Sequence, residues 1–282
     1  MKILILGCGW VGEEVAKSYK KDGVDVYVTC TSEEKRQRLA AMGWNTAVVD
    51  FDQEERIPHF PAKFDFVLNS IPASSRSSEE KVFARFRRVR KFLEAISFRK
   101  QIFLSSVGIY PDEDGVFEES YSEKLNLRLL GAEQFVSLNN TVIYRLGGLF
   151  GKERIFAKYF QHKICTTGEQ PANFVHVDDV VRLILSGFES ELKSTLYNIV
   201  APEHPKKKEV ILASAKKYGF ALPSSLVADP SFQKIVDGSA IVRDLNYSYI
   251  FPSSFKFLVS CWILTSKSFW IRRSSSTIVQ AL

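Results

Sequence analysis

Three glycines near the N-terminus are the residues whose spacing most clearly implies chemistry. Gly7, Gly9 and Gly12 give the pattern G-x-G-x-x-G directly after the apolar run of residues 2–6. In this pattern the first glycine allows a tight turn, the second lets the backbone approach a diphosphate, and the third lets a helix pack closely on a strand. The N–H groups at the start of the following helix carry a partial positive charge, which also suits a diphosphate.

The neighbourhood of the glycines meets the structural conditions of this motif. The preceding run contains β-branched side chains and predicts a buried parallel strand. Apolar residues at helical spacing follow, and a second strand, residues 26–29, comes within about thirty residues of the first. We therefore predict a dinucleotide site that includes the backbone of Trp10 and Val11, rather than a glycine-rich turn without a ligand.

The end of the second strand bears on which dinucleotide is bound. A site that prefers NAD usually places Asp or Glu here to bind the ribose 2′-OH. This chain instead has Thr31 and Ser32, followed by Lys35 and Arg36. Hydroxyl groups and positive charge suit a 2′-phosphate, so the sequence favours NADP over NAD. Ser32 also fits the N-cap of the next helix with both basic side chains exposed, and the two roles are compatible.

Strands and helices alternate along the chain. We expect later strands at residues 46–49, 64–68, 101–104 and 141–144, with helices at 79–96 and about 122–138. This alternation predicts an α/β fold with a doubly wound (Rossmann) parallel sheet. Residues 1–170 would form the dinucleotide-binding domain, 171–255 a small C-terminal substrate lobe, and 256–282 an atypical tail. Part of the region after residue 170 would complete the sheet.

The strand ends are the expected ligand-binding edge, because parallel strands of such a sheet all finish there. In the lobe we expect a helix that ends near residue 186, with Asp178 as its cap. A short strand at 196–200 and a helix at 205–218 would follow. The further residues that we assign to the cofactor site are Asp50, Phe51, Asn69, Ser70, Ile71, Ser105, Leu146 and Gly147.

Length and charge limit the class of protein. A chain of 282 residues, 45% hydrophobic, can form one large α/β domain or a dinucleotide domain with a smaller lobe. The formal net charge of +6 falls to +2 for the first 250 residues, because four bases and no acids follow. The basic cluster at residues 85–91 alternates with apolar residues at helical spacing, which indicates the solvated face of a helix. We therefore expect a small-molecule substrate and no nucleic acid.

Cysteine usage and the chain ends suggest a compartment. The four cysteines have no paired spacing, which predicts reduced thiols rather than a disulfide framework or a metal site. No signal peptide is expected, because the chain leads straight into the first strand. We expect a cytoplasmic protein, and the sequence is compatible with a homodimer.

The tail, residues 256–282, is basic and contains tryptophan. Its largely apolar run is too short to span a bilayer, which needs roughly twenty residues. We interpret the tail as an extension without a function of its own and expect no membrane partner. A segment lying on a membrane surface, or one covering an oligomer interface, is the alternative.

Four motifs occur in an order that permits a comparison with known families. They are the glycine loop, SSVGIY at 105–110, RLGGLFG at 145–151 and FVHVDD at 174–179. Together they resemble the extended short-chain dehydrogenases/reductases, the NAD-dependent epimerase/dehydratase proteins, which act largely on nucleotide sugars. The resemblance spans about residues 1–255. It implies an NAD(P)-linked oxidoreductase or epimerase acting on a nucleotide-sugar-like or small carbonyl substrate.

The chemistry of this family uses a Ser or Thr, a Tyr and a Lys. The resemblance implies that Ser106 is the Ser, which orients and polarises the substrate oxygen. The Tyr exchanges a proton while hydride passes, and the Lys, four residues later on one helix face, lowers the Tyr pKa. Alignment on Ala132-Glu133 places Leu125 where the Tyr stands and Leu129 where the Lys stands. Neither leucine can transfer a proton.

Two residues just before this helix are candidate substitutes. Tyr121 and Lys124 are spaced three apart and lie about one turn too early, so they would serve if the helix began shifted. Tyr110 is another surrogate, although that position is mostly structural in the family. We interpret His176 as a structural hydrogen-bonding residue at a strand-to-helix corner. Two functions stay open: an NADP-linked oxidoreductase or epimerase with an altered proton relay, or a non-catalytic NADP-binding sensor or scaffold.

Overall fold

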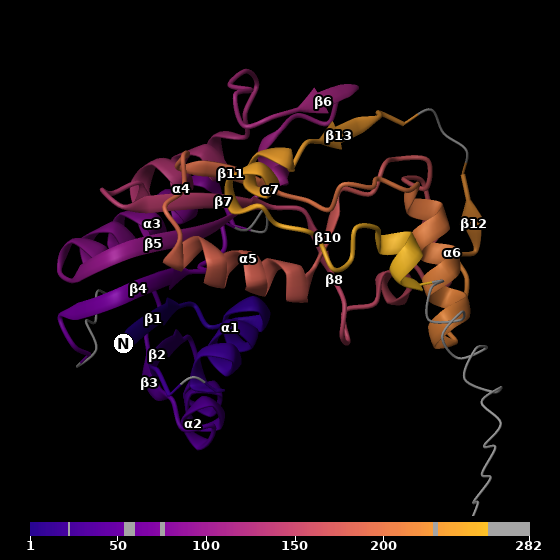
Figure 1. Cartoon of the computed structure of the whole chain (residues 1–282). Helices are drawn as coiled ribbons and strands as arrows, with labels where there is room; N and C mark the ends of the chain where they lie inside the picture. The colour runs from indigo at the N-terminus through magenta and orange to yellow at the C-terminus, as the bar shows by residue number, and fades with distance from the viewer. Residues whose placement is uncertain (22, 54–59, 74–76, 228–230, 259–282) are drawn as a thin grey trace, which may run out of the picture.

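The computed structural model of the chain describes residues 1–21, 23–53, 60–73, 77–227 and 231–258. Its centre is a seven-stranded sheet in which every neighbouring pair of strands is parallel (Figure 1). The strands of this sheet are β1 (Lys2–Leu6), β2 (Asp25–Cys30), β3 (Asn45–Val48), β4 (Lys63–Asn69), β5 (Ser97–Ser106), β7 (Thr141–Leu146) and β11 (Leu196–Ile199).

The strand order, β11-β7-β5-β4-β1-β2-β3, confirms the doubly wound sheet. The chain builds outward from β1 through β2 and β3 on one side, and then through β4, β5, β7 and β11 on the other. The order therefore reverses between β1 and β4, where Leu6 pairs with Asn69. Ligands of open α/β sheets bind at the carboxyl ends of the strands at such a reversal. The glycine loop and the segment after β4 meet at this point.

Helices cover both faces of the sheet (Figure 1). The alternation of side chains along β1 explains why, because Ile3 and Ile5 face one core and Leu4 and Leu6 face the other. The first core includes helices α1 (Trp10–Lys21) and α5 (Val177–Glu189), together with Leu39 of α2 (Glu33–Ala41). The second includes α3 (Glu79–Glu94) and α4 (Leu127–Val136).

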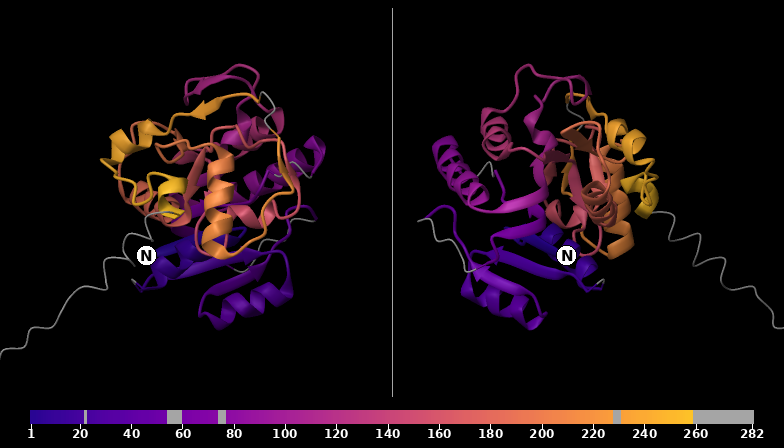
Figure 2. Two further views of the ribbon diagram at one scale, coloured as in Figure 1. Left: turned by 90° about the vertical axis from the view of Figure 1, so that its right-hand side faces the viewer. Right: turned by 60° about the vertical axis from the view of Figure 1, so that its left-hand side comes forward.

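A smaller lobe gathers at one end of the molecule, drawn orange to yellow in Figure 2. Its helix is α6 (Lys207–Tyr218), whereas α7 (Ser239–Leu245) packs on the first core beside β11 (Figure 1). Short strand pairs connect the lobe to the main sheet region. They are β6 (Gly115–Phe117) with β13 (Lys234–Val236), β8 (Gly148–Phe150) with β10 (Phe174–His176), and β9 (Ile164–Cys165) with β12 (Ser225–Leu226). Two 3-10 turns, Val107–Ile109 and Phe156–Tyr159, lie beside these strands.

The helix expected at 122–138 is shorter in the structure. It begins at Leu127, because the side chain of Asn126 accepts a hydrogen bond from the Leu129 N–H at 3.2 Å and caps the helix. Lys124 has φ of 45°, which is incompatible with an earlier helical start. Tyr121 and Lys124 therefore precede the helix, and the shifted start that would place them together on one helix does not occur.

The cap of α5 also differs from the expectation. The prediction of Asp178 is wrong: the N-cap is His176, whose Nδ1 accepts a hydrogen bond from the Asp178 N–H at 3.2 Å. This contact confirms the structural role expected for His176. The predicted tail lies outside the described residues from 259 onward. Across the described ranges, none of the helices combines the length and apolar character needed to cross a bilayer.

Candidate functional site

Hydrogen bonds hold the glycine loop to β2 on one side and to the segment directly after β4 on the other. Gly7 has φ of +68°, a conformation that favours glycine, and its N–H donates to Thr29 Oγ1 at 2.9 Å. The Cys8 N–H donates to the carbonyl of Thr29 at 2.7 Å. From the β4 side, Ser70 Oγ donates to the carbonyl of Gly7 at 2.7 Å. The loop is thus held in one shape before any ligand arrives.

The three glycines have different surroundings. A Cβ on Gly7 would lie 3.1 Å from the Ile71 side chain, and one on Gly12 would lie 3.0 Å from Ile5 Cγ2. These two positions are therefore limited by packing. A Cβ on Gly9 would meet only the carbonyl oxygen of Gly7, at 3.7 Å. The space beside Gly9 is open, which fits a backbone that a diphosphate approaches.

Asn69 adds a polar group at the same place. Its side chain is fully buried at the end of β4, and its Oδ1 accepts a hydrogen bond from the Ile71 N–H at 3.3 Å. Its Nδ2 has no hydrogen-bond partner within the described part of the chain. A buried amide without a partner is uncommon, and an oxygen of a bound dinucleotide would satisfy it. The residues present therefore fit the cofactor expected from the sequence.

The segment after β2 contains the residues assigned to a 2′-phosphate. Thr31 is exposed, and Ser32 caps α2 by accepting a hydrogen bond from the Lys35 N–H at 3.3 Å. Arg36 pairs with Glu33 on the exposed side of α2. The structure therefore leaves Thr31 and Lys35 better placed for a ligand than Arg36.

Arg38 is a residue that the sequence analysis missed. It binds Glu13 through two hydrogen bonds, of 2.6 and 3.0 Å, and Lys35 Nζ lies 3.5 Å from the same carboxylate. Burial raises the pKa of Glu13, but the contacts with Arg38 and Lys35 outweigh this effect and hold the pKa below its usual value. Both cations thus lie at the first turn of α1, beside the glycine loop. The available signal was the i, i+3 spacing of Lys35 and Arg38, which places them on one face of α2.

Asp50 and Phe51 have structural contacts. Asp50 Oδ1 accepts a hydrogen bond from the Asp52 N–H at 2.9 Å, which closes the turn after β3. The Phe51 ring is buried and packs edge-on against Phe92, with 5.8 Å between ring centroids. These contacts explain both residues without a ligand.

Ser106 lies at the carboxyl end of β5, and a leucine lies beside it. Its Oγ accepts a hydrogen bond from the Gly108 N–H at 3.1 Å, which leaves its own O–H free to donate. A Cβ on Gly108 would lie 3.3 Å from Ser106 Oγ and 3.9 Å from Leu129 Cδ1. Leu125 and Leu129 both pack on the apolar cluster that contains Ile109. The two leucines that align with the Tyr and Lys of the resembling family therefore have apolar surroundings.

Tyr121 and Lys124 are held apart by different partners. The Tyr121 ring packs against Phe117 and Tyr110, with centroid distances of 4.9 and 6.1 Å. The ammonium of Lys124 binds Glu113 at 2.9 and 3.1 Å on the surface, and this contact raises the Lys124 pKa. Tyr121 therefore packs on aromatic residues that follow Ser106 in the sequence. Lys124 binds an acidic residue at the surface instead.

Ser105 belongs to a buried polar network rather than to an open site. Its hydroxyl donates to Glu133 at 2.5 Å, and Glu133 also binds Arg145 at 2.7 and 3.0 Å. Arg145 Nη1 donates to the Tyr110 hydroxyl at 3.0 Å, which in turn donates to Asn198 Oδ1 at 2.8 Å. Burial raises the pKa of Tyr110. Tyr110 is therefore a poor proton-transfer surrogate.

Leu146 and Gly147, at the end of β7, face packed surroundings. Leu146 is buried in the sheet core. A Cβ on Gly147 would lie 2.6 Å from the carbonyl oxygen of Asn173, so close approach of the lobe requires glycine here. These contacts explain both residues by packing, and the cofactor role assigned to them remains a prediction.

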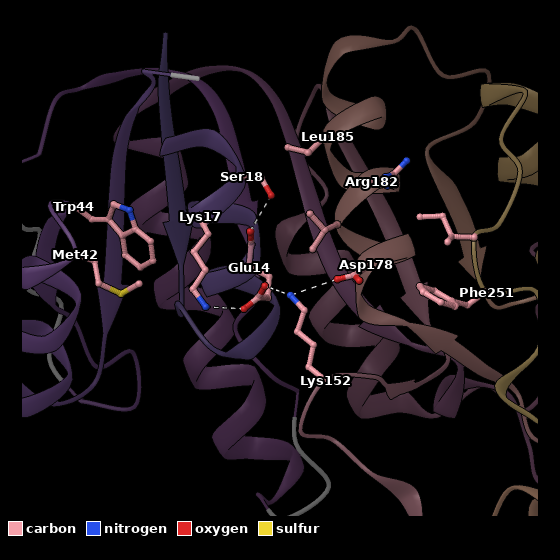
Figure 3. A pocket seen from close by; sticks show the side chains of 12 residues that line it. Glu14, Lys17, Ser18, Met42, Trp44, Lys152, Asp178, Arg182, Leu185 and Phe251 are labelled. Carbon is pink, nitrogen blue, oxygen red and sulfur yellow. Dashed lines mark hydrogen bonds and ion pairs between the residues drawn. The ribbon is translucent and has the colours of Figure 1, made fainter. Parts of the chain in front are cut away.

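A groove of about 1210 Å³ lies between α1 and α5 (Figure 3). Glu14 and Lys17 line one wall and Asp178 the other, with the ammonium of Lys152 between Glu14 and Asp178. Its carboxylates are thus paired with lysines. The three glycines are not among the lining residues, so this groove is distinct from the candidate dinucleotide site at the glycine loop. Within the described ranges, no cluster of three or more His, Cys, Asp or Glu side chains could hold a metal ion.

Comparison with known proteins bears on the glycine loop and on the whole fold. Residues 3–83 match the family described as the saccharopine dehydrogenase NADP binding domain. Protein YeeZ of Escherichia coli strain K12 is 26% identical over 272 residues, covering 89% of this chain and 96% of YeeZ.

Two solved epimerase structures are similar over nearly their full length. ADP-L-glycero-D-manno-heptose-6-epimerase of Helicobacter pylori has a TM-score of 0.72 at 16% identity, covering 95% of this chain and 96% of the epimerase. UDP-glucuronic acid 4-epimerase of Bacillus cereus in complex with NAD has a TM-score of 0.72 at 17% identity, covering 96% and 100%. Residues 3–83 thus resemble an NADP-binding domain, and the whole chain shares its fold with these epimerases, in agreement with the resemblance inferred from the four motifs.

Proposed function

We propose that this protein binds NADP beside the glycine loop and acts as an oxidoreductase or epimerase on a nucleotide-sugar-like or small carbonyl substrate. The observation that carries the proposal is the shape of the loop, which β2 and β4 hold rigidly while the side of Gly9 stays open. Lys35 and Arg38 beside the first turn of α1 support NADP over NAD, because they share the single carboxylate of Glu13 and so leave a net positive charge for a 2′-phosphate.

The roles of the chain's own residues follow from their positions. A bound nicotinamide would supply hydride transfer. Ser106 would donate its O–H to the substrate carbonyl oxygen, since its Oγ already accepts from Gly108. Tyr121 is the side chain that we propose for proton exchange, without help from Lys124, which binds Glu113. Leu125 and Leu129 would exclude water from the reacting groups.

A second function, a non-catalytic NADP-binding sensor or scaffold, is favoured by one observation. Leu125 and Leu129, at the positions aligned with the Tyr and Lys, pack on the Ile109 cluster and can neither carry a proton nor assist a neighbouring phenol. A protein that only reports the presence of NADP would need the glycine loop and no relay. Turnover, rather than binding, therefore separates the two functions.

The test has a binding step and a chemical step. Titration calorimetry with NADP and with NAD should give measurable binding, tighter for NADP. Exchange of deuterium between labelled NADPH and a panel of sugar-nucleotide and carbonyl substrates should then occur in the wild type and fall sharply in Ser106→Ala. Binding without exchange across the panel would support the sensor. Absence of binding to either dinucleotide would refute both functions.

A further inference from the structure

A tight turn directly after β8 lies against the start of α1. Residues 151–154 form this turn, in which the Arg154 N–H donates to the carbonyl of Gly151 at 3.0 Å. Gly151 has φ of +108°, and a Cβ there would lie 2.2 Å from His176 Nε2. Only glycine fits this position, so the turn is packed firmly on the buried ring of His176.

Two basic residues of the turn contact one face of α1. Trp10 and Glu14 are four residues apart and therefore share that face. Lys152 forms ion pairs with Glu14 and, at 3.3 Å, with Asp178 (Figure 3). The guanidinium of Arg154 lies over the Trp10 ring, 5.2 Å from its centroid. The turn thus carries Arg154 to the N-terminal end of the helix.

The two basic residues differ in what balances their charge. Lys152 lies between two carboxylates, and Arg154 makes no ion pair with any residue that the structure describes. The exposed guanidinium therefore adds a positive charge to a helix start that already carries one. An anion at the glycine loop would relieve this repulsion. The planar guanidinium fork matches the paired oxygens of a diphosphate better than a lysine would.

We propose that Arg154 clamps the diphosphate of the bound dinucleotide against the glycine loop, with the Trp10 indole holding the guanidinium in place by a cation–π contact. This inference rests on the proposed dinucleotide function. It adds a cofactor-binding residue, Arg154, that lies outside residues 3–83, the part that matches an NADP-binding domain. The segment after β8 thereby contributes to cofactor binding.

The test uses ligands that separate the diphosphate from the 2′-phosphate. Calorimetry on the full chain should show that Arg154→Gln weakens NADP, NAD and ADP-ribose by a similar factor of about tenfold or more. Adenosine 2′-monophosphate, which lacks the diphosphate, should bind the variant and the wild type alike. Arg154→Lys keeps the charge without the fork and should lose less affinity. Lys158→Gln removes a nearby exposed cation and is the matched control, expected to change nothing.

The outcomes are distinguishable. A folded Arg154→Gln protein that binds ADP-ribose as tightly as the wild type overturns the clamp and leaves the proposed function standing. Loss confined to NADP and adenosine 2′-monophosphate would also overturn it, because Arg154 would then contact the 2′-phosphate. A wild type that binds none of the dinucleotides would instead refute the proposed function, and the clamp with it. Circular dichroism of each variant checks that the fold is retained.

Discussion

Glu133 and Arg145 form a buried ion pair with two contacts, Nε to Oε1 at 3.0 Å and Nη2 to Oε2 at 2.7 Å. Both side chains are at most 4% exposed. The pair joins α4 to β7 and so sets which side of α4 faces the end of β5. On α4, Leu129 lies one turn before Glu133, and its Cδ1 would lie 3.9 Å from a Cβ on Gly108. The buried ion pair therefore holds in place the helix that carries Leu129.

Breaking this pair should be costly. Glu133→Ala leaves the Arg145 charge buried without its partner, so we expect a loss of about 3–5 kcal/mol in the free energy of unfolding. Urea denaturation monitored by circular dichroism measures it. Glu94→Ala is the control, because the Glu94–Arg90 pair is exposed and should contribute about 0.5 kcal/mol or less. Equal losses in both variants would show that the buried pair does not anchor α4.

The sequence predicted the sheet and the glycine loop because both depend on local patterns. The apolar run of β1 and the spacing of Gly7, Gly9 and Gly12 are visible without any long-range information. Arg38 was missed because its significance depends on a partner, Glu13, on another helix. The local sequence pattern of α1 or of α2 alone does not predict an ion pair between the two helices.

The start of α4 was misplaced for a similar reason. Residues 122–138 contain several helix-forming side chains, and the actual beginning depends on the Asn126 cap and the left-handed Lys124 backbone. The sequence gives no sign of the role of Arg154, because the turn that carries it is far from α1 along the chain and contacts that helix only in the folded protein. Residues that meet across the sheet edge leave no periodic signal in the sequence.

Gly9→Ala should separate cofactor binding from stability. A methyl group at Gly9 meets no side chain, so the free energy of unfolding should change by about 1 kcal/mol or less. The same methyl group would occupy the space where a diphosphate approaches, and NADP affinity should fall at least about tenfold. Calorimetry and urea denaturation of the same preparation give both values.

Gly7→Ala is the matched comparison for this prediction. Its φ of +68° and the 3.1 Å approach to Ile71 make an alanine strained, so stability should fall by more than in Gly9→Ala. If Gly9→Ala bound NADP as tightly as the wild type, the diphosphate would have to lie elsewhere.

Arg38 should determine the preference for NADP. Arg38→Gln removes one of the two cations at the first turn of α1, and we expect NADP to bind roughly tenfold more weakly with NAD affinity unchanged. Arg36→Gln is the control, because Glu33 balances the Arg36 charge, whereas Arg38 and Lys35 share one carboxylate, that of Glu13. Calorimetric titrations with the two dinucleotides measure the ratio. A larger effect at Arg36 than at Arg38 would reverse this assignment.

Tyr121→Phe tests the proposed proton donor. Phenylalanine keeps the ring contacts with Phe117 and Tyr110, so the thermal midpoint should change little. If Tyr121 exchanges the proton, kcat should fall by about a hundredfold or more while NADP affinity stays the same. Lys124→Ala should affect neither value strongly, because Lys124 is bound to Glu113 at the surface. Unchanged kcat in Tyr121→Phe would exclude this residue from the relay.

Two histidines should make stability depend on pH just below neutrality. Burial lowers the pKa of His176 and of His204 from the usual 6.5, so both are neutral in the folded chain. The unfolded chain then binds protons first as the pH falls. Their contribution to stability is complete above pH 6.5 and declines as the pH decreases from there toward the folded pKa.

The carboxylates with lowered pKa values change the free energy of unfolding in a lower pH range than the histidines. Glu13 and Glu14 lose their contributions only as the pH falls below their usual 4.5, whereas burial raises the pKa of Glu119. The difference between the wild type and the histidine variants, between about pH 7.5 and about pH 5.5, therefore reports the histidines. His176→Asn keeps an oxygen that can cap α5 and removes the titrating ring. Urea midpoints across that interval should shift less in His176→Asn than in the wild type, with His204→Asn as the second variant. Identical pH dependence in all three proteins would show that neither ring is held neutral by burial.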